Sequence, residues 1–132
     1  MTPLAHGIDL VPIDRIARML ADHADRFLER CFTPAERDYC LSRARPADHL
    51  AARFAAKEAI LKALATGWSA GIAWTDAEVI TLPTGAPGVA LHNHALRIAD
   101  EQGIRAWLLS LTHASGLAMA SAIALGHPPA TA

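Results

Sequence analysis

The stretch PADHLAARFAAKEAILKALAT, residues 46–66, decides the fold of this chain. It is rich in Ala, Leu, Lys and Glu, all of which favour helical backbone. Gly67 follows directly, and glycine commonly ends helices because it adopts left-handed backbone without strain. We therefore predict one long helix over residues 46–66, with the other elements arranged around it.

Shorter helices and strands are predicted on both sides of this helix. Thr33 begins a capping box with Glu36, and Pro34 takes the first helical position, so a short helix starts there. Hydrophobic periodicity predicts helices over residues 13–28, 34–41 and 93–102, and strands over residues 6–12, 74–82, 88–91, 105–112 and 117–125. Residues 113–116 are expected to form the loop between the last two strands. Because the helices come early and the antiparallel hairpins late, the predicted fold class is α+β.

The composition fits a single domain, expected over residues 1–126 and followed by a flexible Pro- and Ala-rich tail over residues 127–132. Much of the 52% hydrophobic fraction is alanine, so the core should be closely packed rather than bulky. No apolar run approaches the ~20 residues of a membrane helix, and no signal peptide is visible. Cys31 and Cys40 match no zinc or redox spacing, and we expect buried or half-buried free thiols in a soluble, cytoplasmic protein.

The net charge of −1 gives no reason to expect nucleic acid or a membrane surface as partner. Most of the Lys and Arg residues lie between Arg15 and Lys62. The first half of the chain can therefore present a positive field to an anionic partner, despite the neutral balance.

Three candidate functional residues are ambiguous when taken locally. Glu58 and Lys62 are four residues apart and share a helix face, as either a surface ion pair or part of a site. Asp9 interrupts an apolar strand, so its carboxylate either points outward or has a partner. His113 is either a polar loop residue or a functional histidine.

Other motifs are weaker. His92 and His94 are alternate residues that could bind a metal, although ordinary surface histidines explain them as well. The sequence has no glycine-rich phosphate loop of the Walker or Rossmann type. Ser110 and Ser115 lie near His113 without a nucleophile elbow, so a hydrolase triad is not supported.

Several segments together resemble one known family. They are GIDLV (7–11) with Ile13, Arg15 and Ile16, RFAAKEA (53–59) with Lys62 and Ala63, WTDAEV (74–79), GAP (85–87) and SLTH (110–113). This set is similar to the holo-[acyl-carrier-protein] synthases, the small trimeric members of the phosphopantetheinyl transferase superfamily. The resemblance extends from Gly7 to about Leu125, and the RFAAKEA run is its most specific part.

The resemblance implies an α+β fold with an antiparallel sheet packed against the long central helix. It also implies a reaction in which 4′-phosphopantetheine passes from coenzyme A to a serine of an apo acyl carrier protein. The products are holo carrier protein and adenosine 3′,5′-bisphosphate. Two other functions stay open: a non-catalytic module that binds carrier protein or coenzyme A, and a metal-dependent nucleotide phosphohydrolase.

The resemblance also implies roles for individual residues. Asp9 and Glu58 match the Mg²⁺ ligands, and magnesium favours carboxylate, water and phosphate oxygens. Glu58, or a water on the metal beside it, is the candidate acceptor of the serine proton. Lys62 is implied to neutralise charge on the phosphates and is counted with Asp9 and Glu58 as catalytic. Arg53, Lys62, Thr112 and His113 are the implied coenzyme A-binding residues.

The same resemblance places the carrier protein on the first helix, at Arg15, Arg18 and Met19. It implies a homotrimer with sites at the subunit interfaces, for which Trp107 and Leu109 are the exposed apolar candidates. This chain departs from the family at three positions: Ala65 replaces a glycine after the long helix, Asn93 replaces a glycine before the late helix, and Ala114 replaces a glutamate after His113.

Overall fold

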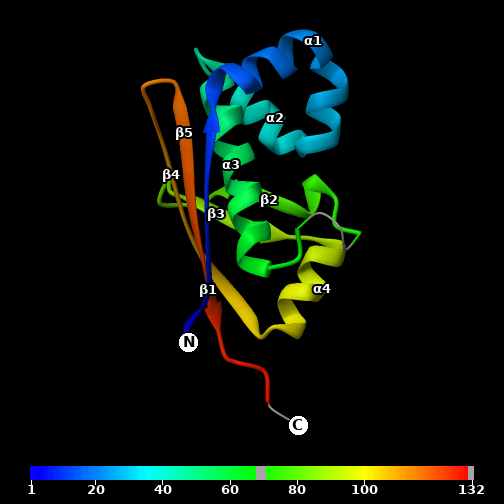
Figure 1. Ribbon diagram of the computed structural model, residues 1–132, viewed down its shortest axis with the longest axis vertical. Helices are drawn as coiled ribbons and strands as arrows, with labels where there is room; N and C mark the ends of the chain where they lie inside the picture. Colours follow the sequence, from blue (N-terminus) through cyan, green and yellow to red (C-terminus); the bar gives the residue numbers. More distant parts are fainter. Residues whose placement is uncertain (68–70, 131–132) are drawn as a thin grey trace.

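The structure, a computed structural model, describes residues 1–67 and 71–130 of the chain. Strands and helices follow one another in an α+β order, as predicted (Figure 1). The elements are β1 (Thr2–Pro12), α1 (Ile13–Cys31), α2 (Pro34–Leu41), α3 (Pro46–Leu64), the 3-10 helix η2 (Trp74–Asp76), β2 (Ala77–Thr81), β3 (Pro87–Leu91), α4 (Asn93–Glu101), β4 (Ile104–Ala114) and β5 (Leu117–Gly126). No helix in the described ranges combines the length and apolar character that crossing a membrane requires.

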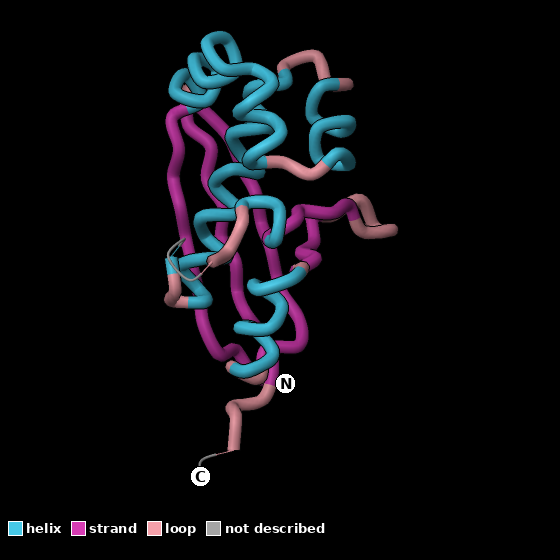
Figure 2. The backbone as a smooth tube through the Cα atoms, turned by 90° about the vertical axis from the view of Figure 1, so that its right-hand side faces the viewer, coloured by secondary structure: helices cyan, strands magenta, loops and turns pink. Residues whose placement is uncertain are grey.

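The main sheet has three antiparallel strands in the order β1-β5-β4, so β1 and β4 form its two edges. A separate hairpin pairs β2 with β3. Helices α1 and α2 lie at the end of the sheet that carries the β4–β5 turn, and both termini lie at the opposite end (Figure 1). The long helix α3 runs along one face of the main sheet, which we call the inner face (Figure 2).

Small residues allow α3 to lie unusually close to the inner face. Every second residue of β5 between Ala118 and Ala124 is an alanine with no more than 1% exposure, and Ala59 of α3 is fully buried. Gly7 of β1 is in such close contact that an added Cβ would lie 1.8 Å from the Ala59 carbonyl oxygen. The alanine-rich composition therefore produces the closely packed core that the sequence predicts.

A buried ion pair joins α3 to the elements beside it. The Lys57 ammonium donates to Glu36 Oε1 at 2.8 Å, to the Ala77 carbonyl at 2.7 Å and to the Trp74 carbonyl at 3.2 Å. Both charged side chains are 0% exposed, and Glu36 Oε2 accepts from the Val79 amide at 2.9 Å. All three ammonium protons thus have acceptors, which is the condition under which a buried charge is tolerated. The pair fixes α2, η2 and β2 against α3.

Some predicted boundaries and faces are wrong. The long helix ends at Leu64, because Ala65 already has left-handed backbone with φ of 59°. His113 and Ala114 belong to β4, because only Ser115 and Gly116 turn the chain, with φ of 54° and 78°. Positive φ at both turn residues is the geometry of a tight two-residue hairpin.

The predicted exposure of Trp107 and Leu109 is also wrong. Both side chains are half-buried and pack against the core, since the register places them opposite the buried Ala124 and Ala122 of β5. Leu108, between them, points to the other face of the sheet and is 55% exposed. Successive residues of a strand point to opposite faces, so the register decides which leucine is exposed.

Ala65→Gly is expected to raise the free energy of unfolding by ~0.5–1 kcal/mol. Glycine relieves the strain that the alanine Cβ imposes at positive φ, and this gain exceeds the extra entropy of glycine in the unfolded chain. Urea denaturation at fixed protein concentration measures the change. The matched control Ala17→Gly, within α1, should lower stability by about 1 kcal/mol. If both variants changed the free energy of unfolding in the same direction, Ala65 would not be a strained left-handed position.

Asn93 is the second position at which this chain has another residue where the resemblance leads us to expect glycine. Its φ is 50°, a conformation that Asn tolerates better than most residues, and its side-chain amide donates to the buried Asp76 carboxylate at 3.1 Å. The asparagine therefore replaces a glycine without leaving the turn unsupported. The tail expected over residues 127–132 begins with a hydrogen bond from the His127 amide to Gly103, and its last two residues lie outside the described range.

Candidate functional site

Asp9 and Lys62 meet where the edge strand β1 passes α3. The Lys62 ammonium lies 3.0 Å from Asp9 Oδ1 and 2.9 Å from the Ile8 carbonyl oxygen. The Asp9 side chain is 18% exposed and that of Lys62 is 55% exposed. Asp9 alternates with the buried residues Gly7 and Val11, so it belongs to the inner face. The carboxylate in the apolar strand thus has a cationic partner from a residue 53 positions later.

Glu58 lies one helical turn before Lys62 and therefore on the same flank of α3. It is half-buried, between fully buried neighbours. No group of three or more His, Cys, Asp or Glu side chains suited to a metal occurs among the described residues. Two carboxylates on one flank nevertheless fit Mg²⁺, which usually takes one or two protein carboxylates and completes its octahedron with water and substrate phosphate oxygens.

A second group of predicted site residues surrounds a different cavity, about 170 Å³ in volume. Arg53 and His113 both line it, together with Tyr39, His49 and Leu111. The Arg53 guanidinium carbon lies 4.1 Å from the centre of the Tyr39 ring, and the His49 and His113 ring centres are 6.1 Å apart. The cavity is cationic and lies between α2, the start of α3, the β2–β3 hairpin and β4, a setting suited to an anionic group.

The two groups lie on opposite flanks of α3. Arg53 and Glu58 are five residues apart, which separates their directions by about 140° around a helix of 3.6 residues per turn. Asp9 approaches from the β1 edge of the sheet, while His113 approaches from the β4 edge. One copy of the chain therefore presents two separate groups of candidate residues, which we call the two half-sites.

Thr112 is not in the cavity with its neighbour. It pairs with Met119 of β5 on the outer face of the sheet, whereas His113 pairs with the buried Ala118 and points to the inner face. His49, by contrast, was not among the predicted site residues although it lines the cavity. Its position one turn before Arg53 on α3 was the signal that could have identified it.

A larger groove, about 680 Å³ in volume, runs beside α1. Phe54 and Trp74 form an aromatic wall, with ring centres 4.6 Å apart in a stacked arrangement, and the Arg15 guanidinium lies 5.9 Å from the Phe54 ring centre. Its other lining residues are Ile16, Met19, His23, Arg26, Phe27, Glu29, Arg30 and Cys31. The groove therefore combines an apolar floor with several cationic side chains.

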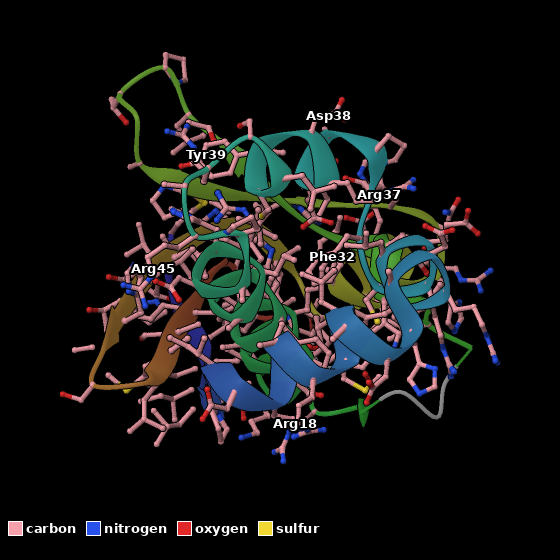
Figure 3. The ribbon with its side chains drawn as sticks, turned by 90° about the horizontal axis from the view of Figure 1, so that it is seen from above. Arg18, Phe32, Arg37, Asp38, Tyr39 and Arg45 are labelled. Carbon is pink, nitrogen blue, oxygen red and sulfur yellow. The ribbon has the colours of Figure 1, made fainter. Side chains whose placement is uncertain are left out.

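Of the three predicted docking residues, two share this groove. Arg15 and Met19 line it, but Arg18 lines a separate shallow depression on the other side of α1. In Figure 3, Arg18 points away from the body of the molecule, whereas Phe32 points into it. Helix α1 is kinked at His23, whose backbone is not helical, and the kink lies along the groove.

The remaining candidates have local partners. His92 Nε2 lies 2.9 Å from Glu78 Oε1, while His94 contacts Arg97. Cys31 and Cys40 are free and buried, as predicted. Burial raises the pKa of each thiol to about 11, so both stay protonated and weakly nucleophilic at neutral pH.

Comparison with known proteins places this architecture in one family. Residues 5–120 match the family model described as the 4′-phosphopantetheinyl transferase superfamily. A holo-[acyl-carrier-protein] synthase from Solibacter usitatus is 44% identical over 117 residues, which cover 89% of this chain and 94% of that protein. One from Desulforudis audaxviator is 49% identical over 123 residues, covering 93% of each protein.

Solved structures of the same family also match this chain. The holo-[acyl-carrier-protein] synthase of Helicobacter pylori, in complex with coenzyme A, matches with a TM-score of 0.80 at 29% identity, covering 91% of this chain and 99% of that one. The Neisseria meningitidis enzyme matches with a TM-score of 0.82 at 30% identity, covering 92% and 97%. This chain therefore belongs to the holo-[acyl-carrier-protein] synthase family of the 4′-phosphopantetheinyl transferase superfamily.

Proposed function

We propose that the protein transfers 4′-phosphopantetheine from coenzyme A to a serine of an apo acyl carrier protein. The observation that carries the proposal is the meeting of Asp9, Lys62 and the flank of α3 that holds Glu58. A flank with carboxylates and an ammonium group suits a bound metal ion and pyrophosphate. The relatives of this chain are named holo-[acyl-carrier-protein] synthases, which supports the same activity. In the reaction the serine Oγ forms a bond to the β-phosphorus, and the pyrophosphate bridge breaks to release adenosine 3′,5′-bisphosphate.

The side chains divide the work of this reaction. Asp9 and Glu58 would hold Mg²⁺, which when bound offsets the negative charge of the pyrophosphate. Glu58 accepts the proton of the serine hydroxyl, directly or through water. Lys62 is paired with Asp9 but half exposed, so it can turn its ammonium toward the phosphates as charge develops on the leaving group. Arg53 and His113 hold the nucleotide end, whereas Thr112 lies on the outer face of the sheet and does not line their cavity.

A homotrimer would bring the two half-sites together. The outer face of the sheet exposes a group of apolar side chains, namely Ile8, Leu10, Leu108, Leu117 and Met119. We propose that copies of the chain cover this face, so that the Asp9–Glu58 flank of one copy lies near the Arg53–His113 cavity of the next. Light scattering of the purified protein should then give three times the mass of one chain.

The carrier protein is proposed to dock on α1, at Arg15, Arg18 and Met19. The groove beside α1 adds Phe27, Phe54 and Trp74 as an apolar surface between cationic side chains. Such a surface would attract an acidic amphipathic helix. Because both cysteine thiols are free, the proposed location is the cytoplasm.

Arg15→Glu is expected to raise the KM for the carrier protein by tenfold or more, roughly, while changing the KM for coenzyme A little. The reversed charge repels an acidic partner but lies in the groove rather than on the Asp9 flank. Steady-state kinetics with each substrate varied separately measure both constants. The control Asp25→Lys, on the same helix, should not raise the carrier KM. Equal increases in both constants for Arg15→Glu would exclude this docking surface.

Intact-mass spectrometry tests the function directly. Candidate apo carriers are incubated with coenzyme A, Mg²⁺ and the protein, and transfer adds the mass of one phosphopantetheine group. A non-catalytic binding module would be stabilised by coenzyme A without modifying any carrier. A phosphohydrolase would release free phosphopantetheine without carrier protein. Either result would replace the proposed function.

A further inference from the structure

His49 occupies the cavity between α2, α3 and β4 without a role in the activity proposed above. Its ring stands edge-on to Tyr39, with centres 5.9 Å apart, and 6.1 Å from the ring of His113. The Arg53 guanidinium extends back along α3 to the His49 carbonyl oxygen and covers the Tyr39 ring. Two imidazoles and a guanidinium therefore face one small cavity.

The charges around His49 are mainly positive. Arg53 and Asp48 come from α3, Arg43 lies over the Tyr39 ring at 4.2 Å, and His113 faces it from β4. The carboxylate of Asp48 is engaged by Arg45, at 3.3 Å, on the same side of the molecule as Tyr39 (Figure 3). Burial lowers the pKa of His49, and the positive charges of Arg53, His113 and Arg43 lower it further, against a smaller opposing effect of Asp48.

We propose that His49 binds the phosphate monoester at the nucleotide end of coenzyme A, together with Arg53 and His113, and so helps to discriminate coenzyme A from its 3′-dephospho form. The inference rests on the proposed function, because it assigns the nucleotide end to this cavity. A protonated imidazole at 6.1 Å from His113 can donate to the same phosphate oxygens as Arg53.

The direction of the pH effect follows from the charges. In the free protein, burial and then the surrounding cations lower the pKa of His49 and favour its neutral form. A bound phosphate monoester, whose second pKa is about 6, brings negative charge that favours the protonated form. The complex therefore holds more protons on His49 than the free protein does. His49 should strengthen binding as the pH falls, and its contribution should vanish as the pH rises.

Calorimetry of wild type and His49→Phe with adenosine 3′,5′-bisphosphate tests this. Phenylalanine keeps the ring between Tyr39 and His113 but cannot carry a proton. We expect the variant to bind the bisphosphate roughly tenfold more weakly than wild type at pH 6, and almost equally at pH 8. The ratio of the two dissociation constants at each pH does not depend on the protonation of the ligand, because both proteins bind the same ligand. Titrations in two buffers of different ionisation enthalpy should show that wild type takes up more protons on binding.

Adenosine 5′-monophosphate, which lacks the 3′-phosphate, should bind both proteins with similar affinity. His49→Gln, a second neutral variant, should behave like His49→Phe, and His127→Gln, on the exposed segment after β5, should behave like wild type. An equal loss for both nucleotides, or a variant-to-wild-type ratio that does not change with pH, would overturn the role of His49.

Transfer assays on the same proteins separate the inference from the function. Suppose that wild type modifies an apo carrier but that the ratio of the dissociation constants of His49→Phe and wild type does not change with pH. The proposed transferase function is then supported, and His49 has no role in phosphate recognition. If that ratio changes with pH but no carrier is modified, the nucleotide site is supported and the proposed function is excluded. If both hold, the KM for coenzyme A should rise in His49→Phe at pH 6 with kcat unchanged.

Discussion

Asp9→Ala and Glu58→Ala are each expected to lower kcat for phosphopantetheine transfer by roughly a thousandfold or more. Each change removes one of the two carboxylates proposed to hold Mg²⁺, and the Glu58 change also removes the proposed proton acceptor. The free energy of unfolding should change by no more than about 1 kcal/mol, because neither side chain is part of the fully buried core. Transfer is measured by intact mass and stability by urea denaturation.

The metal assignment has its own readout. Asp9→Asn and Glu58→Gln preserve the size of each side chain but weaken its affinity for a hard cation, so both should raise the Mg²⁺ concentration needed for half-maximal transfer. Glu101→Ala, at the exposed end of α4, is the matched control and should leave that concentration unchanged. Full activity in either alanine variant would exclude Asp9 and Glu58 as the metal ligands.

Lys57→Met is expected to lower the free energy of unfolding by ~3–5 kcal/mol. The change leaves the fully buried Glu36 carboxylate without its ammonium partner, and leaves two carbonyl oxygens without their donor. Methionine has similar volume, so the loss reports the buried charge rather than a cavity. Urea denaturation measures the change, and circular dichroism establishes whether the variant is folded.

Two comparisons distinguish a buried pair from an exposed one. Lys62→Met breaks the partly exposed pair with Asp9 and should change stability by no more than about 1 kcal/mol. The double variant Lys57→Met/Glu36→Gln should be more stable than the sum of the single effects predicts, because it removes both charges together. A small effect of Lys57→Met, equal to that of Lys62→Met, would show that the buried pair does not hold α2 and β2 against α3.

The local elements could be predicted because their signals are local. The capping box of Thr33 and Glu36 is present with both hydrogen bonds, and α2 begins and ends where the sequence places it. Helix propensity located α3 to within two residues of its end. The prediction at that end is wrong because Gly67 is not the first residue with left-handed backbone: Ala65 already adopts it and ends the helix.

Some site residues could likewise be placed from local patterns, and others could not. The spacing of Glu58 and Lys62 was enough to place both on one flank, because a helix brings residues four apart together. The partner of Asp9 and the contact between His49 and His113 join residues far apart in the sequence, and no local pattern encodes them. The direction of Thr112 and of Trp107 depends on strand register, and register is set by which face the whole sheet buries.

By itself, then, the sequence determined the α+β order of elements, the long helix and a set of candidate site residues, because propensity, capping and motif spacing act over a few residues. Only the tertiary structure decided that these residues form two half-sites on opposite flanks of α3, and that His49 joins one of them. It also decided that Lys57 is a buried structural cation while Lys62, five residues on, reaches Asp9. The physical reason is that these relations depend on which face of α3 the sheet covers.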